Sequence, residues 1–409
     1  MRQKPVNDES RLPNWPEPVR GGKYLRLLER HVRQLREQHP HGNQLVFADD
    51  VVLAHLLAFF NPTLRSLRTI EDFSQTRQAR RHLSVRKLCR STLADFHRLA
   101  DPAILQPIIA HLHALARERR CLPTDLPETL AQVLAVDGSF FALSADVAWA
   151  VRHGTNNGKK RASARLDMHL DVRTWLPEII DVCGNDTSEA ASAARHVRPG
   201  AIHIYDRGIF SFELVQAQLK AGAFFVHRLR EPGERQPQFR SEQERPLSDT
   251  DRAAGVIADG MGRLAGSTHR QAPDVLLREV IIASPDEPGG QVRLLTNLTD
   301  LEAHWLGMLY RYRWQVELFF RWLKVFANFE HMISESRSGI LLSFYVAVIG
   351  VLLMYLFTDA KPSKYAFSLL ALVANGSATL DEIAPILAER ERRIALDKAS
   401  LARRLAKKS

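Results

Sequence analysis

The stretch LYRYRWQVELFFRWLKVF, residues 309–326, decides how the rest of the chain is interpreted. At about 100° of rotation per residue, four polar residues fall within about 60° on one side of a helix: Tyr310, Arg313, Glu317 and Lys324. The opposite side collects five apolar residues: Leu309, Val316, Phe319, Phe320 and Leu323. The pattern predicts one helix that packs by its apolar face and displays a polar stripe on the other.

The polar stripe has two interpretations. Arg and Lys bind phosphates, Tyr stacks or donates a hydrogen bond, and Glu can hold a metal ion, so the stripe suits a strand of nucleic acid. Glu and Lys are also good helix formers, and such a stripe is common on an ordinary solvated face. The helix alone leaves both interpretations open.

The spacing Y-x2-R-x3-E-x6-K resembles the signature of DDE transposases of bacterial insertion sequences, in the insertion-sequence-four group. The resemblance implies that Glu317 is the third catalytic carboxylate and that two Asp residues precede it, each at the end of a strand. It also implies that Tyr310, Arg313 and Lys324 contact phosphates of the transposon end. Trp314, beside Arg313, would then stack on a displaced base.

Two aspartates fit this expectation. Asp137 and Asp206 each follow a short apolar run and precede a Gly-containing segment that we interpret as a turn. Functional groups gather at the carboxyl ends of strands in open α/β sheets, although a single Asp there is more often a turn residue. By resemblance, Asp137, Asp206 and Glu317 are the catalytic metal ligands. Such a set holds two Mg²⁺ ions, with Mn²⁺ as the alternative, about 3.5–4 Å apart.

Other carboxylates, Asp167, Asp171, Glu178 and Asp181, lie along predicted strands, where we expect half-exposed side chains without a catalytic role. One departure from the family concerns tryptophan. Some relatives place a tryptophan in the insertion, where it wedges into a flipped base, and this chain has none between Trp175 and Trp305. Whether a hairpin intermediate forms is therefore left open.

The order of predicted elements, strands first and then alternating helices and strands, indicates an α/β mixed sheet with flanking helices. It is similar to a ribonuclease H-like fold. We expect five parts: a flexible lead-in (1–22), an all-helical N-terminal domain (23–128), a ribonuclease H-like catalytic domain (129–229 and 291–360), a β-rich insertion (230–290) and a basic helical C-terminal region (361–409).

Further basic residues are candidate DNA contacts. We expect Ser84 to cap a helix that carries Arg86, Lys87 and Arg90, as in helix-turn-helix DNA readers. A helical bundle with a solvated basic face is nearly as good an interpretation, and the wider context favours DNA binding. Lys159, Lys160 and Arg161 follow a turn signal between two predicted strands.

Composition supports a polyanionic partner. The 409 residues are enough for two to three domains, and 56 Lys and Arg against 46 acidic residues give a net charge of +10. Anionic membrane surfaces fit the charge as well as DNA does. The three cysteines are widely spaced, which indicates neither a zinc site nor a disulfide framework and favours a reducing cytoplasm.

Residues 339–357 are uncharged over about the length that spans a bilayer. A lone transmembrane segment and a buried core helix both fit, and we expect the core helix because nothing else in the chain is membrane-like. No membrane partner is therefore predicted.

The leading hypothesis is a DNA transposase that cuts at the terminal inverted repeats of its element and joins the 3′-hydroxyls to target DNA. The family implies a homodimer on double-stranded DNA, and we expect a nucleoid-associated protein of the bacterial cytoplasm. The rivals are a catalytically inactive, transposase-derived DNA-binding protein, which would not need three carboxylates, and a membrane-associated protein.

Overall fold

The computed structural model describes these residues: 34–35, 46, 48–61, 63–77, 79–81, 83–118, 126–127, 129–144, 147–154, 160–229, 239–265, 272–287, 289–325, 332–358, 362–374 and 376–406. Contacts between Cα atoms divide the chain into a sheet unit, Cys121–Arg321, and a helical unit, Met1–Arg120 with Trp322–Ser409. The lead-in expected at residues 1–22 lies outside the described residues.

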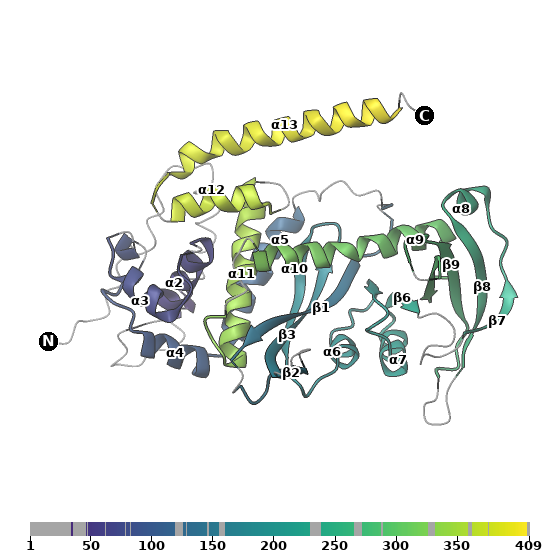
Figure 1. Cartoon of the computed structure of the whole chain (residues 1–409), viewed down its shortest axis with the longest axis horizontal. Helices are drawn as coiled ribbons and strands as arrows, with labels where there is room; N and C mark the ends of the chain where they lie inside the picture. Colours follow the sequence, from purple (N-terminus) through teal and green to yellow (C-terminus); the bar gives the residue numbers. More distant parts are fainter. Residues whose placement is uncertain are drawn as a thin grey trace. The chain divides into compact units, whose positions relative to one another are not determined.

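The helical unit is built around one long apolar helix, α11, which packs against α2, α4 and α5 (Figure 1). Its described helices are α2 (Ala48–Phe60), α3 (Leu67–Ser74), α4 (Arg90–Leu99), α5 (Gln106–Glu118), α11 (Arg337–Thr358), α12 (Lys364–Ala374) and α13 (Leu380–Ala406), with 3₁₀ turns η2 (Ala79–Arg81) and η3 (Pro102–Leu105).

Helix α11 is, among the described residues, the one helix long and apolar enough to cross a membrane. Most of its side chains are buried, and Phe59 of α2 lies so close to Gly350 that a Cβ there would overlap the ring. This burial matches the expected core helix. The boundary between the two units lies between Arg321 and Trp322, whereas the sheet domain was expected to extend to residue 360.

The prediction that Ser84 caps a helix is wrong. Helix α4 begins at Arg90, after Cys89, and residues 84–89 are bends and irregular chain. The backbone N–H and the hydroxyl of Ser84 both donate to the carboxylate of Asp50, each at 2.6 Å, so the serine anchors this segment to α2 and not to a helix of its own.

The sheet unit contains one ten-stranded mixed sheet, in the order β2-β3-β1-β5-β6-β10-β9-β8-β7, with β4 paired to β3 beside β2. Its strands are β1 (Val133–Leu143), β2 (Val151–Gly154), β3 (Lys160–Asp171), β4 (Leu176–Cys183), β5 (Ile202–Tyr205), β6 (Phe224–Leu229), β7 (Phe239–Glu244), β8 (Val256–Leu264), β9 (Leu277–Ala283) and β10 (Gln291–Thr296). Strand β1 is antiparallel to β3 and parallel to β5, and β5 is parallel to β6.

The expected insertion continues this sheet. Strand β10 pairs antiparallel with β6 on one side and with β9 on the other, and β8 and β7 follow. A buried ion pair joins Arg278 of β9 to Asp259 of β8 at 2.7 Å. The short helix α8 (Asp249–Ala253) connects β7 to β8.

Helices cover the sheet. Helices α6 (Glu189–Arg195) and α7 (Phe212–Lys220) begin after the capping residues Ser188 and Ser211 and share an apolar cluster with β1, β5 and β6. Helix α9 (Ala303–Tyr312) packs on β6, β8 and β9, and α10 (Trp314–Val325) follows it in nearly the same direction (Figure 1). The apolar face predicted for residues 309–323 is buried: Leu309, Val316, Phe319, Phe320 and Leu323.

Candidate active site

Asp137 lies in the middle of a strand. The predicted turn at residues 137–139 is wrong, because β1 continues to Leu143 in unbroken antiparallel pairing with β3, with Asp137 opposite Met168. The parallel pairing of β1 with β5 stops one residue earlier, at Val136 and Tyr205. Asp137 therefore still lies at the carboxyl end of the parallel part of the sheet, where functional groups gather.

Asp206 is placed as predicted, directly after β5 and before a turn. The hydroxyl of Tyr310, on α9, donates a hydrogen bond to its Oδ1 at 3.0 Å. Arg228, on the neighbouring strand β6, brings Nη1 to 4.0 Å from the same oxygen. Burial raises the pKa of Tyr310 to about 12, and the charge of Asp206 adds to the rise, so the phenol stays protonated and acts as a donor.

The single helix expected at residues 309–326 is interrupted at Arg313. The N–H of Arg313 donates to the carbonyl of Tyr310, and that of Val316 donates to the carbonyl of Arg313, so both bonds close turns of the 3₁₀ type. The polar stripe is also less exposed than expected, because the Arg313 side chain is buried. Tyr310 turns toward Asp206 and Arg313 toward Asp137, while Glu317 pairs with Arg313.

Arg313 lies between two of the predicted catalytic carboxylates. Its Nη1 is 2.6 Å from Oε1 of Glu317 and 4.0 Å from Oδ2 of Asp137, and its guanidinium lies 5.7 Å from the ring centroid of Tyr310. The structure thus brings Asp137, Asp206 and Glu317 together from a strand, a strand end and a helix.

The electrostatics of Asp137 reflect this clustering. Burial raises the pKa of Asp137 to about 7, and the negative charges of Glu317 and Asp206 add to the rise. Arg313 and the N–H of Gly138, which donates to Asp137 Oδ1 at 2.9 Å, oppose the rise. Because burial and neighbouring negative charges disfavour the charged form of Asp137, an added cation would stabilise that form.

The carboxylates suit a divalent cation in chemistry, since hard cations such as Mg²⁺ and Mn²⁺ take oxygen ligands. Among the described residues, no three acidic, His or Cys side chains are close enough to hold one ion as they stand. The positive group at this point is the Arg313 guanidinium, which occupies the space between Glu317 and Asp137. A cation bound here would take over part of the charge balance that Arg313 supplies.

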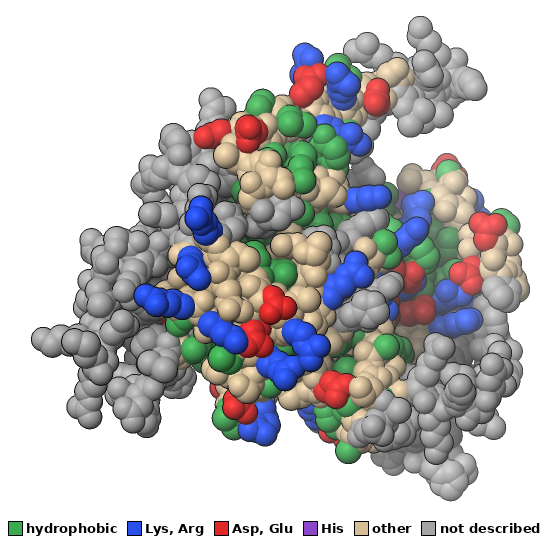
Figure 2. All heavy atoms as spheres, turned by 60° about the vertical axis from the view of Figure 1, so that its left-hand side comes forward, with side chains coloured by type: hydrophobic (Ala, Val, Ile, Leu, Met, Phe, Trp, Pro, Cys, Tyr) green, Lys and Arg blue, Asp and Glu red, His purple; other side chains and the backbone are tan. Residues whose placement is uncertain are grey.

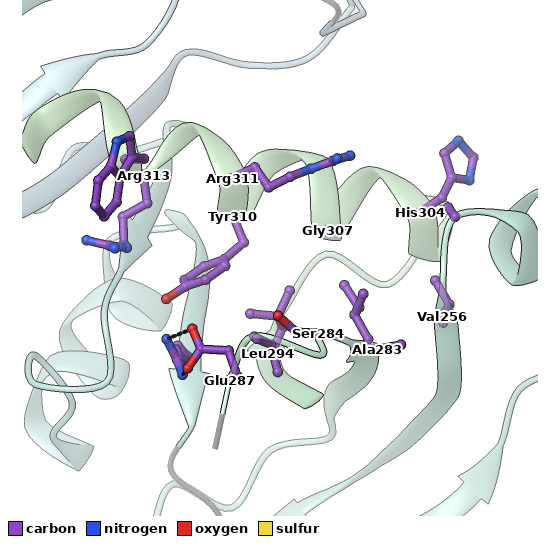
Figure 3. Close-up of a pocket in the computed structure, with 15 residues that line it drawn as sticks. Val256, Ala283, Ser284, Glu287, Leu294, His304, Gly307, Tyr310, Arg311 and Arg313 are labelled. Carbon is purple, nitrogen blue, oxygen red and sulfur yellow. Dashed lines mark hydrogen bonds and ion pairs between the residues drawn. The ribbon is translucent and has the colours of Figure 1, made fainter. Parts of the chain in front are cut away.

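A pocket of about 390 Å³ opens beside these groups. Its walls are largely apolar and come from β8, β9, β10 and α9, while Arg228, Tyr310, Arg313 and Trp314 border it on the side of the carboxylates. Figure 3 shows Tyr310 pointing from α9 into the pocket, toward the side where Glu287 lies. Glu287 accepts two hydrogen bonds from Arg228, at 3.1 and 2.6 Å, and so holds Arg228 beside Asp206.

Arg228 and Glu287 were not found by sequence reasoning. Arg228 lies between buried residues of β6 and resembles any strand residue, and Glu287 belongs to the polar segment interpreted as an insertion. Their pairing depends on β10, which returns to β6 and carries the turn of Glu287 with it.

The remaining residues of the helix signature differ in their surroundings. The side chain of Trp314 is 56% exposed, which leaves its ring available to a base. Lys324 lies in the last turn of α10 and belongs to the helical unit, so its contact with a transposon end stays a prediction.

The other candidate DNA contacts are mostly dispersed. Arg86 and Lys87 precede α4 in irregular chain, and Lys87 is paired with Glu71 at 2.9 Å, while Arg90 begins α4 and is exposed. In Figure 2, Lys and Arg side chains are spread over the visible face with acidic side chains among them. Lys159 lies outside the described residues, and Lys160 and Arg161 begin β3, with side chains that are likewise not described.

Three of the four carboxylates expected to be half-exposed, Asp167, Asp171 and Glu178, have more buried side chains than predicted, while Asp181 is half-exposed as expected. Asp167 and Asp171 are buried, and Asp167 binds Arg165 through two hydrogen bonds, at 2.7 and 2.9 Å. Glu178 pairs with Arg198 at 3.0 Å, and Asp181 pairs with Arg195 at 2.9 Å. All four carboxylates thus make ion pairs or hydrogen bonds within the sheet unit.

Comparison with known proteins gives the family. Residues 128–355 match the family described as "Transposase DDE domain". The chain belongs to this family. It is 26% identical over 230 residues to the "Putative transposase y4zB" of Sinorhizobium fredii (strain NBRC 101917 / NGR234), covering 56% of this chain and 61% of that protein. All three predicted carboxylates lie within the matched residues.

A second relative is the "Probable transposase for insertion sequence element IS5377" of Geobacillus stearothermophilus, 25% identical over 219 residues, covering 52% of this chain and 53% of that protein. Among solved structures, the chain is similar to a piggyBac transposase synaptic complex with hairpin DNA, with a TM-score of 0.38 and 13% identity, covering 90% of this chain and 80% of that one. The chain thus spans between half and two thirds of the length of these two curated relatives.

Proposed function

We propose that this transposase-family chain is an active, metal-dependent enzyme that cuts DNA at the ends of an insertion sequence and joins the freed 3′-hydroxyls to target DNA. The observation that carries the proposal is the convergence of Asp137, Asp206 and Glu317, from three separate elements, around the guanidinium of Arg313. A protein that only binds DNA gains nothing from three carboxylates beside a polyanion, because they repel phosphates.

The three carboxylates would hold two Mg²⁺ or Mn²⁺ ions, which when bound activate a water or a 3′-hydroxyl and stabilise the leaving oxygen. The chain's own residues position the DNA. Tyr310 and Arg313 are placed to contact phosphates near the scissile bond, and Trp314 offers an exposed ring for stacking. Arg313 would exchange its contact with Glu317 for a phosphate when cations neutralise the carboxylates.

We further infer that the sheet has a ribonuclease H-like fold. The strand order β4-β3-β1-β5-β6, with β3 antiparallel and β5 parallel to β1, supports this fold. The net charge of +10 supports a DNA partner. A homodimer assembled on two DNA ends in the bacterial cytoplasm, together with membership of the insertion-sequence-four group, belongs to the same proposal.

The test is cleavage of a labelled duplex that carries the end of the flanking element, with Mg²⁺ or with a chelator. We expect Glu317→Gln to lower cleavage by at least about 100-fold, the order of loss when one preorganised electrostatic group is removed, while binding of the duplex persists. Glu244→Gln is the control, because Glu244 is exposed on β7. Binding without cleavage by the unmodified chain would favour the inactive DNA-binding derivative instead.

A further inference from the structure

Glu189 is an acidic residue with no structural partner near the candidate site. It is the first residue of α6, after the capping serine Ser188, and its side chain is half-buried. Within the described parts of the chain, its carboxylate makes no hydrogen bond and no ion pair within 4 Å. Burying a carboxylate without a partner costs free energy, so its position calls for an explanation other than stability.

Glu189 lies near the point where the strands that carry the two aspartates stop pairing with each other. Strand β5 ends at Tyr205 while β1 continues, so Gly138 has β3 on one side and no paired strand on the other. Successive residues of a strand face opposite sides of the sheet, and Val136, two residues before Gly138, packs in the cluster of α6 and α7. Gly138 therefore faces α6, and Asp137 faces the opposite side.

The missing side chains of two glycines make room for Glu189. A Cβ built on Gly138 would lie 3.3 Å from Oε1 of Glu189, and one built on Gly208 would lie 3.9 Å from its Oε2. Gly138 directly follows Asp137, and Gly208 comes two residues after Asp206. The carboxylate of Glu189 thus lies between the backbones that carry the two aspartates and approaches them across the end of β5.

Glu189 is not the counterion of the nearest arginine. Arg165 is bound by both oxygens of Asp167, at 2.7 and 2.9 Å, so its charge is already matched. Burial raises the pKa of Glu189, Arg165 opposes the rise, and the charges of Asp167 and Asp206 add to it. The charge of Asp206, one of the proposed metal ligands, therefore acts on Glu189 directly.

We propose that Glu189 is a fourth acidic residue of the active site, which holds, directly or through a water molecule, the divalent cation assigned to Asp137 and Asp206. This inference rests on the proposed function. A divalent cation takes six or more oxygen ligands, and three carboxylates leave positions for water and for a further side chain. Glu189 would fill one of these positions from the side of the sheet opposite to Glu317.

The competing explanation is that Glu189, in the first turn of α6, only favours the helix N-terminus through its charge. Glu213 is a matched control, since it is an acidic residue in the first turn of α7, lies two residues after the capping serine Ser211 and is exposed. Glu213→Gln removes the same kind of charge from the same kind of helix position.

The experiment is a titration of the full chain, without DNA, with Mn²⁺ alone, in which free Mn²⁺ is followed by electron paramagnetic resonance. We expect Asp137→Asn and Glu189→Gln each to weaken Mn²⁺ binding by about tenfold or more, the range found when residues around a metal are removed, and Glu213→Gln to leave it unchanged. Glu189→Asp keeps the charge but withdraws it by one methylene, and its affinity should fall between those of the unmodified chain and Glu189→Gln.

The outcomes separate the two claims. Weaker binding by Asp137→Asn with unchanged binding by both Glu189 variants would overturn the role of Glu189 and leave the proposed function intact. No Mn²⁺ binding, or binding that Asp137→Asn does not affect, would overturn the metal site itself and the role of Glu189 with it. If Glu189→Gln does not fold, Glu189→Asp decides, because unchanged affinity in that variant contradicts the proposal.

Discussion

Replacement of Asp137 by Asn should change how the stability of the metal-free chain depends on pH. Burial, with the neighbouring carboxylates, raises the pKa of Asp137 from 3.8 to about 7 in the folded protein. The folded state then holds this proton at pH values where the unfolded chain has lost it. Stability from Asp137 is fully present below pH 3.8 and is lost as the pH rises through 7.

The size of the effect follows from the shift. At about 1.36 kcal/mol per pKa unit, the rise corresponds to a loss of about 4 kcal/mol above pH 7, an upper figure because the side chain is 23% exposed. Roughly 2.5 kcal/mol of this loss develops between pH 5 and pH 8. Asn carries no charge at either pH, so Asp137→Asn should gain that much in free energy of unfolding, relative to the unmodified chain, from pH 5 to pH 8.

The assay is urea unfolding at a series of pH values in the presence of a chelator, with Asp286→Asn as the control, because Asp286 is an exposed carboxylate in the turn before β10. The control should follow the unmodified chain at every pH. If the curves of Asp137→Asn and the unmodified chain stay parallel from pH 5 to pH 8, Asp137 is not buried against other negative charges, and the account of the site is wrong.

Three further predictions concern packing and a buried histidine. Gly138→Ala should lower the free energy of unfolding by about 1–3 kcal/mol in denaturant titration, because its Cβ would lie 2.8 Å from Oδ1 of Asp167, a buried residue whose Oδ1 accepts a hydrogen bond from Arg165. Gly350→Ala should lower the melting temperature even though Ala has the better helix propensity, because its Cβ would lie 2.5 Å or less from two atoms of the Phe59 ring. An unchanged or higher melting temperature would show that α2 and α11 are not packed this tightly. Burial lowers the pKa of His97 to about 3, so the folded state does not bind a proton that the unfolded chain binds. The free energy of unfolding should therefore fall by roughly 2 kcal/mol between pH 7 and pH 5. In the same urea assay, His97→Gln should show a smaller fall.

The sequence predicted the parts of the site that depend on local pattern. The apolar run before Asp206 is a buried strand, and the aspartate follows it directly. The apolar face of residues 309–323 is buried as the helical spacing requires. These features are set by neighbouring residues and by the period of a helix or a strand, which a sequence shows directly.

The parts that were missed depend on pairing between distant residues. Asp137-Gly138-Ser139 reads as a turn, yet β3 pairs with it residue by residue and extends it as a strand. Gly138 is needed there because side chains from β3 and α6 fill the space that a Cβ would occupy. Polar residues of β7 and β8 carry too weak an alternation to be recognised as strands. These strands form because β8 pairs with the edge of β9 and β7 pairs in turn with β8.

Glu189 shows the same limit at the site itself. In sequence it is an ordinary acidic residue at the start of a helix, and Glu213 has the same local signal. What distinguishes Glu189 is that β5 ends beside it and that two glycines, 138 and 208, leave its carboxylate room. Neither condition can be read from the residues around position 189.

The most direct test of the central claim, that Asp137, Asp206 and Glu317 form a metal-dependent DNA-joining centre, is strand transfer from a pre-cut element end. A labelled duplex with a free 3′-hydroxyl is mixed with supercoiled plasmid, Mg²⁺ and either the unmodified chain or Asp206→Asn. We predict that the unmodified chain attaches the label to the plasmid only with Mg²⁺, and that Asp206→Asn binds the duplex but transfers nothing detectable. Transfer by Asp206→Asn at the level of the unmodified chain, or transfer in the presence of a chelator, would contradict the account.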